Sequence, residues 1–410
     1  MNKILSIFMV AVLGMAVFSS TSFASGFRLA EQDSAATGMS SAFVGQADSP
    51  AAVWYNPAGI TQLDGTRISG GVIGVYPVLT HETIYGTTDV SERDVHLPVH
   101  LYATHRLNDS IVFGVGVNNP FGLVTDWNPQ TSVTKNVATF SKIVSTEINP
   151  NIAYKISDNL SIAFGIAYVH LRATLENILP VAGSPDFRLS GDGDGWGANA
   201  AMKYKATDQV SFGLSYRSRV KVKLDGTAEI APGLGILSNP GSTEVTLPDL
   251  IQAGVSYKAS DKLTVNADID YTLWSTYDRL VIQSNTILLL TGGTSNTATE
   301  EKQWHDVWCI RLGGQYQLSD QWKLRAGYVY DKNPVNDTYF DTITPDSDRQ
   351  GVSIGTGYTI GNTTVDLAYM YLRFNKRTLS DSLVDGSSQI LNGTYKSQAQ
   401  LAGITIGYKF

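Results

Sequence analysis

Leu160–Tyr168 reads LSIAFGIAY, and large and small side chains alternate strictly along it. In an extended chain, Leu, Ile, Phe, Ile and Tyr share one face, whereas Ser, Ala, Gly and Ala share the other. The same alternation returns at 322–331, at 365–371 and at 404–410, where the chain ends on an aromatic residue. Alternation of period two over such lengths predicts β-strands with one apolar face.

Short polar turns divide the chain at fairly regular intervals. They contain Asn108-Asp109, Ser157-Asp158-Asn159, Thr207-Asp208, Ser260-Asp261, Ser319-Asp320 and Gly361-Asn362. Each interval between neighbouring turns also contains one longer irregular stretch. This pattern is typical of hairpins with tight turns at one end of a barrel and long loops at the other. A periplasmic β-sandwich is the alternative, although its strands are rarely this long.

The alternating runs predict an all-β fold, a 14-stranded antiparallel transmembrane β-barrel over residues 66–410. An even strand number, with both chain ends on the tight-turn side, agrees with bacterial single-chain barrels. Several runs exceed the roughly 9–11 residues that cross a bilayer, so the barrel should project beyond the outer surface. The expected strands are 66–81, 96–107, 110–118, 136–156, 159–178, 187–205, 208–230, 242–258, 261–284, 301–318, 321–334, 348–360, 362–377 and 395–410.

Composition agrees with a membrane barrel better than with a soluble enzyme. Charged residues make up 16% of the 410 residues, against about 25% in ordinary globular proteins. The formal charge is −7 and no basic block is present, which argues against nucleic acid as a partner. A single cysteine excludes an internal disulfide framework and a cysteine-rich metal site.

The first residues have the organisation of a secretory signal peptide. Lys3 supplies the positive charge, 4–18 is almost entirely apolar, and Ser22-Phe23-Ala24 offers a cleavage site after Ala24. A short transmembrane anchor is the alternative, but the apolar run is shorter than the ~18 residues that a spanning helix needs. We therefore expect residues 1–24 to be removed and the protein to reside in the bacterial outer membrane.

Residues 25–65 do not have the pattern of strands. Ser49-Pro50 and Asn56-Pro57 interrupt any regular element, and Gly38, Gly45 and Gly59 add further breaks. A barrel of this size has an interior too wide for its own side chains to fill. The segment is therefore predicted to fold into the lumen as an N-terminal hatch, or plug.

Several stretches resemble the long-chain fatty-acid transporter (FadL) family, which includes outer-membrane channels for fatty acids and for aromatic hydrocarbons. The resemblance covers the whole mature chain, and the stretches that carry it are 25–29 (SGFRL), 51–59 (AAVWYNPAG), 118–127 (NNPFGLVTDW), 193–199 (GDGWGAN), 247–249 (LPD) and 274–278 (WSTYD). The resemblance implies a fourteen-stranded barrel closed by an N-terminal hatch, in agreement with the strand count above. It also implies that Asn56, Pro57, Ala58 and Gly59 form the gating motif of the hatch.

Residues around Pro120 are the candidates for a lateral opening in the wall. Proline has no amide hydrogen for the strand ladder, and glycines permit a kink or bulge. The third strand is therefore predicted to bend inward and open a gap at Gly114, Gly116, Asn118, Asn119, Pro120, Phe121 and Gly122. The resemblance further implies that Asn56 hydrogen-bonds to the backbone exposed there. The alternative is that Pro120 merely begins an external loop.

These features predict a passive channel for hydrophobic small molecules. The lumen-facing set Ala163, Gly165, Ala167 and Val169 is small and apolar, unlike the charged lumen of a general porin. Fatty acids or hydrocarbons would enter through the hatch and leave sideways into the membrane, from a monomer surrounded by outer-membrane lipid and lipopolysaccharide. An aqueous porin is the first alternative, and a lipase-like outer-membrane enzyme is the second.

No catalytic residue, metal site or cofactor is assigned. His96 and His100 share a strand face but His105 does not, and the calcium-loop start at Asp192 and Asp194 meets Lys203 where a glutamate is required. Ligand contacts stay unassigned; Arg28, Lys323 and Arg325 are candidates on charge alone. The apolar run 287–290 either collects cargo outside or tucks into the barrel mouth.

Overall fold

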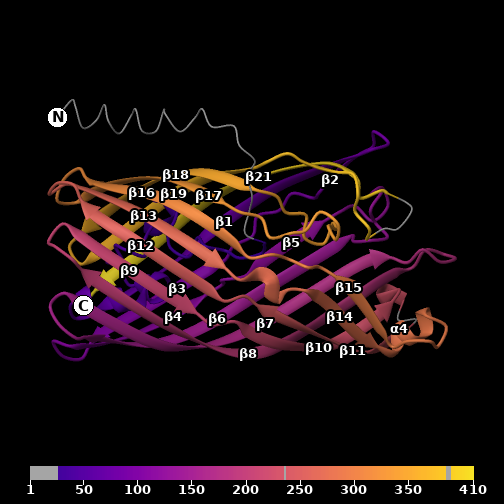
Figure 1. Ribbon diagram of the computed structural model, residues 1–410, viewed down its shortest axis with the longest axis horizontal. Helices are drawn as coiled ribbons and strands as arrows, with labels where there is room; N and C mark the ends of the chain where they lie inside the picture. The colour runs from indigo at the N-terminus through magenta and orange to yellow at the C-terminus, as the bar shows by residue number, and fades with distance from the viewer. Residues whose placement is uncertain (1–25, 235–236, 385–388) are drawn as a thin grey trace.

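The computed structural model describes residues 26–234, 237–384 and 389–410, which form a closed 14-stranded antiparallel β-barrel (Figure 1). The expected signal peptide, 1–24, lies outside the described residues. Among the described residues, no helix has the length and apolarity to cross a bilayer. The predicted fold class and strand number are confirmed.

Some barrel strands are continuous, and others consist of two shorter strands in line. The continuous ones are β1 (Thr66–Thr83), β3 (Val99–Arg106), β6 (Phe140–Lys155), β7 (Leu160–Ile178), β8 (Asp186–Lys205), β17 (Trp322–Asp331), β18 (Arg349–Ile360), β19 (Thr363–Phe374) and β21 (Gly393–Lys409). The divided ones are β4 (Ile111–Asn118) with β5 (Gly122–Asp126), β9 (Val210–Arg217) with β10 (Val220–Ile230), β11 (Leu237–Leu247) with β12 (Leu250–Lys258), β13 (Leu263–Thr272) with β14 (Arg279–Ser284), and β15 (Thr297–Glu301) with β16 (Val307–Gln317). Two further short strands, β2 (Thr88–Val90) and β20 (Arg377–Leu379), pair with the outer parts of β1 and β21.

The barrel closes where β1 pairs with β21, from Arg67↔Lys409 to Thr83↔Gly393. Along β7, Phe164 and Ile166 are more than half exposed, whereas Ala163 and Val169 are almost fully buried. The apolar face therefore points outward to the membrane, as the alternation in the sequence predicts. The C-terminus lies at the end that carries the tight turns (Figure 1).

Four strands that the sequence predicts as continuous are interrupted in the structure. The breaks fall at 218–219, 248–249, 273–278 and 302–306. Pro248 has no amide hydrogen to donate to a neighbouring strand. At this break, the buried Asp249 carboxylate accepts hydrogen bonds from the Arg219 amide and the Tyr216 hydroxyl. Side chains thus satisfy the polar groups that a regular ladder would pair.

Two short helical elements lie in the external loops, η3 (Pro232–Leu234) and α4 (Asn285–Leu290), and η4 (Trp274–Thr276) occupies one of the breaks. The apolar run 287–290, expected either on the outer surface or in the barrel mouth, has both buried and exposed residues. Ile287 is buried in the largest hydrophobic cluster, whereas Leu289 is 60% exposed.

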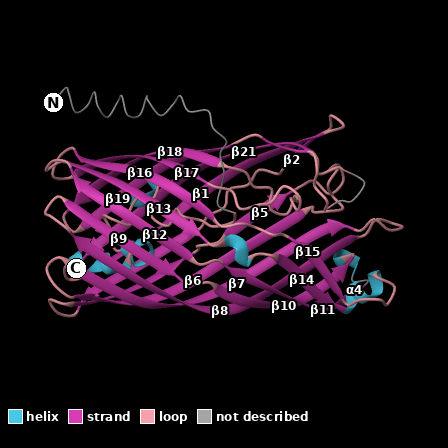
Figure 2. Ribbon diagram, in the orientation of Figure 1, coloured by secondary structure: helices cyan, strands magenta, loops and turns pink. Residues whose placement is uncertain are grey.

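Residues 26–65, which we term the N-terminal segment, lie inside the barrel and contain no barrel strand. Short helical turns, α2 (Ser34–Thr37), α3 (Ala52–Tyr55) and η2 (Pro57–Gln62), alternate with loops (Figure 2). Phe43, Val53 and Trp54 of this segment share a buried cluster with small wall residues, among them Ala153 and Ala163. The small inward side chains of the wall therefore provide room for the segment.

Candidate functional site

The wall opens between the second and third barrel strands. The ladder between β3 and β4 ends at His100↔Asn118, and β5, beyond the break at 119–121, pairs only with β6. A hydrogen bond from the Glu92 amide to the Asp126 carbonyl, 2.8 Å long, crosses the opening at its outer end. Since β5 continues the strand, Pro120 interrupts a strand and does not begin an external loop.

The Asn119 side chain spans this break. Its Oδ1 accepts a hydrogen bond from the Val99 amide at 2.9 Å, and its Nδ2 donates to the Ser145 carbonyl at 2.6 Å. It thereby joins the strand before the opening to the strand after it. The Ser145 hydroxyl accepts from the Phe121 amide and donates to the Phe121 carbonyl, both at 2.8 Å. The backbone at the break is therefore held by side chains.

The N-terminal segment contributes the remaining partners of the broken strand. The Leu29 amide donates to the Pro120 carbonyl at 2.8 Å, and the Gly122 amide donates to the Phe27 carbonyl at 3.0 Å. Gln32 Nε2 donates to the Asn119 carbonyl at 2.9 Å. Residues 27–29 thus act as a short additional strand at the opening.

Asn56 does not contact this backbone, so the hydrogen bond expected from it to the third strand is wrong. Its Nδ2 donates to the carbonyls of Val44 at 3.0 Å and Met202 at 3.1 Å, and its Oδ1 accepts from the Ala58 amide. Asn56 thereby caps η2, which Pro57 begins, and ties the N-terminal segment to β8. Gly59 lies so close to Ala47 that a Cβ there would be 2.4 Å from the Ala47 Cβ.

Gly114 and Gly116 lie in regular β4, where they pair with Thr104 and Tyr102 and do not form a kink. A Cβ on either glycine would approach the Val53 side chain, at 2.7 Å and 3.1 Å. These glycines therefore make room for α3, and the bend is confined to 119–121.

A cavity of about 590 Å³ leads from the lumen to this opening. Leu372, Ala399 and Leu401 line its inner part, and Val95, Leu97 and Val144 line the part in the wall. Val95 and Leu97 are about 60% exposed. The lining of the cavity therefore includes residues of the interior and residues of the outer face of the barrel.

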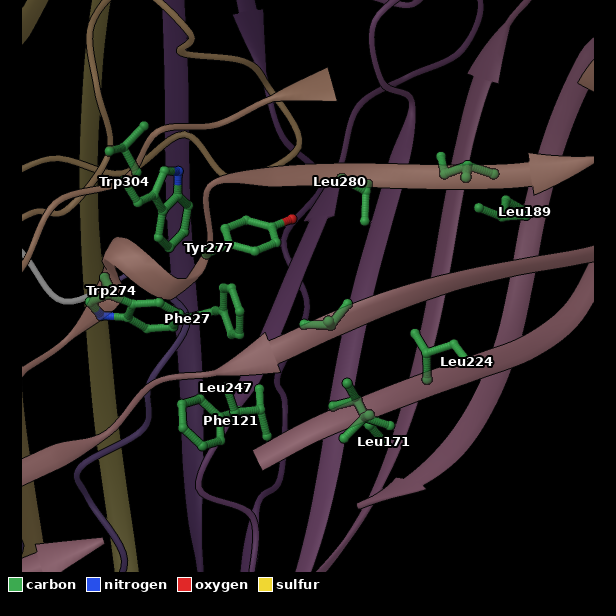
Figure 3. Close-up of a cluster of buried hydrophobic side chains, with 14 of the residues drawn as sticks. Phe27, Phe121, Leu171, Leu189, Leu224, Leu247, Trp274, Tyr277, Leu280 and Trp304 are labelled. Carbon is green, nitrogen blue, oxygen red and sulfur yellow. The ribbon is translucent and has the colours of Figure 1, made fainter. Parts of the chain in front are cut away.

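An aromatic cage holds the beginning of the N-terminal segment (Figure 3). The Phe27 ring lies 4.6 Å from the ring of Trp274, 5.7 Å from Trp304, 5.9 Å from Tyr277 and 6.0 Å from Phe121. Trp274 enters the cage from η4, one of the strand breaks. The breaks thus place large side chains around the residues that meet the opening.

Buried charges fix the rest of the N-terminal segment, and sequence reasoning missed most of them. Arg217 donates to Glu147 at 2.8 Å and to the carbonyls of Val53 and Trp54, and its guanidinium lies 4.0 Å from the centre of the Trp54 ring. Lys203 Nζ donates to the carbonyls of Gly45 and Gln46. No local motif identifies these residues, because their partners lie far away in the sequence.

The three basic residues proposed on charge alone do not form a group. Arg28 lines the cavity, but its guanidinium is bound to Asp270 at 2.6 Å. Arg325 is bound to Asp366 at 2.6 Å, and Lys323 is the second residue of β17, beside a tight turn, and does not line the cavity.

A Gly-x-Ser-x-Gly sequence, which the sequence analysis missed, occurs at 351–355. It lies within β18, whereas a hydrolase nucleophile needs a strand-to-helix turn. The Ser353 hydroxyl accepts a hydrogen bond from the Ser40 amide at 2.8 Å and lies 2.9 Å from the Ser40 hydroxyl. Its role in the structure is to hold the N-terminal segment.

Comparisons with known proteins agree with this architecture. A putative outer membrane protein of Neisseria meningitidis is 26% identical, with 98% of each chain covered, and a long-chain fatty acid transport protein of Salmonella typhi is 24% identical, with 97% of each covered. Among solved structures, a FadL homologue of Pseudomonas aeruginosa matches with a TM-score of 0.83 at 20% identity, over 94% of this chain and 100% of that one. The Ralstonia pickettii toluene transporter TbuX matches with a TM-score of 0.71 at 18% identity, over 92% and 98%. The family model described as "Outer membrane protein transport protein (OMPP1/FadL/TodX)" matches residues 15–410, so the chain belongs to this family of outer-membrane transport proteins.

Proposed function

We propose that this protein is a passive outer-membrane channel that admits hydrophobic small molecules and releases them sideways into the membrane. The cargo class is fatty acids or hydrocarbons, in line with the names of its relatives. The observation that carries the proposal is the cavity between the second and third strands, whose lining includes both buried interior residues and exposed residues of the outer face. The channel acts as a monomer surrounded by outer-membrane lipid and lipopolysaccharide.

The apolar lining of the cavity supports such a cargo. Each CH₂ group that leaves water gains about 0.8 kcal/mol, so a long apolar molecule gains little from a water-filled pore. A sideways exit also spares the cargo a passage through the aqueous periplasmic end of the barrel. An aqueous porin needs neither an apolar lining nor a sideways exit.

The N-terminal segment is the gate in this proposal. Residues 27–29 supply hydrogen bonds to the broken strand, and Asn56, Pro57, Ala58 and Gly59 fix the segment lower in the lumen. Movement of residues 27–29 away from 120–122 widens the exit. The segment therefore works as a hatch that controls release at the lateral opening.

A reversible crosslink between segment and wall tests this gate. The Leu29 Cγ atom, whose place a cysteine Sγ would take, lies 3.7 Å from the position of a Cβ on Gly122, so Leu29→Cys and Gly122→Cys bring two thiols close enough to crosslink. We expect uptake of labelled oleate or toluene, measured separately in a host without its own hydrophobic-compound channel, to fall to the background level when the pair is oxidised. Reduction should restore uptake in the same variant.

The single variants, Leu29→Cys and Gly122→Cys, are the matched controls, and their uptake should not depend on the redox state. The native Cys309 is buried and does not interfere. Equal uptake by the oxidised and reduced double variant would contradict the gate. If the reduced double variant, the single variants and the parent protein all take up neither compound, the channel function itself is contradicted.

A further inference from the structure

We infer that this channel selects uncharged cargo and disfavours carboxylates, because Glu92, Asp94 and Asp126 give the outer end of its cavity a negative charge. The inference rests on the proposed function and narrows it from hydrophobic molecules in general to neutral ones such as hydrocarbons and alcohols. The charged side chains that line the cavity determine which head groups it accepts.

The arginines that line the cavity are already neutralised. The Arg28 side chain is 2% exposed and is bound to Asp270 at 2.6 Å; Arg311 binds the same carboxylate at 3.2 Å and lies 3.8 Å from Glu31. Two guanidinium groups and two carboxylates therefore cancel each other. Arg28, within the N-terminal segment, and Arg311, which donates to the Ser40 carbonyl of that segment, both serve to hold the segment to the wall.

Arg349, the other arginine of the lining, is committed in the same way. Its Nε and Nη2 donate to one oxygen of Asp331 at 3.0 Å and 2.8 Å. Asp346 lies beside it in the lining and accepts a hydrogen bond from the Gly26 amide at 2.8 Å. The inner part of the cavity thus offers a fatty-acid carboxylate no unpaired cation among the described residues.

The outer end of the cavity carries an excess of acids. Glu92, Asp94 and Asp126 line it, and none of them forms an ion pair with any residue that the structure describes. The Glu92–Asp126 backbone hydrogen bond keeps two of these residues side by side. Lys142 lines the cavity at this end, whereas the exposed Arg93, between Glu92 and Asp94 in the sequence, does not; the lining there therefore has three carboxylates and one amine.

An anionic head group that passes this end meets like charges beside apolar walls. Apolar walls lower the local dielectric constant and strengthen such interactions relative to open water. A neutral head group of the same size meets no such repulsion. The carboxylates therefore discriminate by charge, while the apolar lining accepts either kind of chain.

The test compares decanol with decanoate, which share a chain and differ in the charge of the head group at pH 7.5. In a host without its own hydrophobic-compound channel, we expect the parent protein to raise the initial uptake of labelled decanol and to raise that of decanoate much less. The variant Glu92→Gln/Asp94→Asn/Asp126→Asn should increase decanoate uptake by roughly three- to tenfold and leave decanol uptake within about twofold. Each compound is compared with itself across variants, so differences in metabolism cancel.

The matched control is Asp109→Asn/Asp261→Asn/Asp320→Asn, which removes the same charge at tight turns far from the cavity. It should change neither uptake rate. The single change Glu92→Gln, at an exposed side chain, serves if the triple variant does not reach the membrane.

The outcomes separate the inference from the proposed function. The selection by charge would be overturned, and the channel function would stand, if the parent protein took up decanoate as fast as decanol. The same holds if Glu92→Gln/Asp94→Asn/Asp126→Asn took up decanoate no faster than Asp109→Asn/Asp261→Asn/Asp320→Asn. Uptake of neither compound by any of these proteins would overturn the channel itself.

Discussion

Arg217 is the residue on which the position of the N-terminal segment depends most directly. It is buried, it binds Glu147, and it donates to two backbone carbonyls of α3. A buried ion pair contributes little net stability, but removal of one partner leaves an uncompensated charge. Arg217 therefore acts mainly by specifying where the segment docks.

We predict that Arg217→Met lowers the free energy of unfolding by about 3–5 kcal/mol. Adding Glu147→Gln should recover part of this loss, because the carboxylate is then no longer buried without its partner. Urea unfolding in detergent micelles, followed by tryptophan fluorescence, measures both. Lys221→Met is the control: Lys221 forms an exposed pair with Glu244, so its loss should cost less than about 1 kcal/mol. Equal losses for the two single variants would refute the role of Arg217.

Asp346 makes the attachment of Gly26 depend on pH. Burial raises the pKa of Asp346 to about 7, partly offset by Arg349 and by the hydrogen bond from the Gly26 amide. Because the pKa in the folded state is higher than in the unfolded state, the group stabilises the fold below about pH 4 and loses this contribution as the pH rises through about 7. The change amounts to at most about 1.4 kcal/mol per pH unit over that interval.

We therefore expect the amides of residues 27–29 to open more readily at pH 8 than at pH 5. Hydrogen exchange, corrected for the intrinsic effect of pH, measures the opening. In Asp346→Asn, which cannot ionise, the dependence on pH should largely disappear. If hydrogen exchange in Asp346→Asn depends on pH as strongly as in the parent protein, another titrating group causes the dependence.

At the scale of elements, a side chain replaces the missing ladder in the third barrel strand. Asn119 satisfies the Val99 amide on one side and the Ser145 carbonyl on the other. We predict that Asn119→Ala lowers stability by about 1–3 kcal/mol, since the carbonyl of the buried Ser145 and the Val99 amide lose their partner, and that it speeds exchange of the Val99 amide.

The neighbouring Asn118→Ala is the control for this prediction. Asn118 is buried, but its Nδ2 has no hydrogen-bond partner among the described residues, so its loss should leave exchange at Val99 nearly unchanged. Equal exchange at Val99 in the two variants would show that Asn119 does not hold the opening.

The sequence predicts the strands well because each one carries its own pattern. The alternation at 160–168 and the six tight turns are local signals, and they suffice for the strand number and for the inward and outward faces. The breaks at 218–219 and 273–278 have no local signal, since they depend on Asp249 and on the aromatic cage around Phe27. The partners of Asn56 and Arg217 are missed for the same reason: the contacts arise only when the segment is inside the barrel.

At the scale of the whole molecule, the barrel and the N-terminal segment depend on each other. A 14-stranded wall encloses more space than its own side chains fill, and the small inward residues Ala153, Ala163 and Ala201 enlarge that space. The segment fills it with Phe43, Trp54 and Tyr55 and satisfies buried arginines of the wall. In the proposed function, the filled lumen excludes water and the cavity at one side is the path of the cargo.

Ion conductance tests this arrangement. We predict that the intact protein in a planar bilayer conducts weakly, and that deletion of residues 26–60 raises the conductance on the order of tenfold, because the emptied lumen becomes a water-filled pore. Leu289→Ser/Leu290→Ser, a change at exposed residues of α4, should leave conductance unchanged. An intact protein that already conducts like an open pore would favour the aqueous porin. If the deletion variant inserts as a folded barrel and still conducts weakly, the wall itself must narrow the lumen, and the N-terminal segment would then control the lateral exit without sealing the barrel.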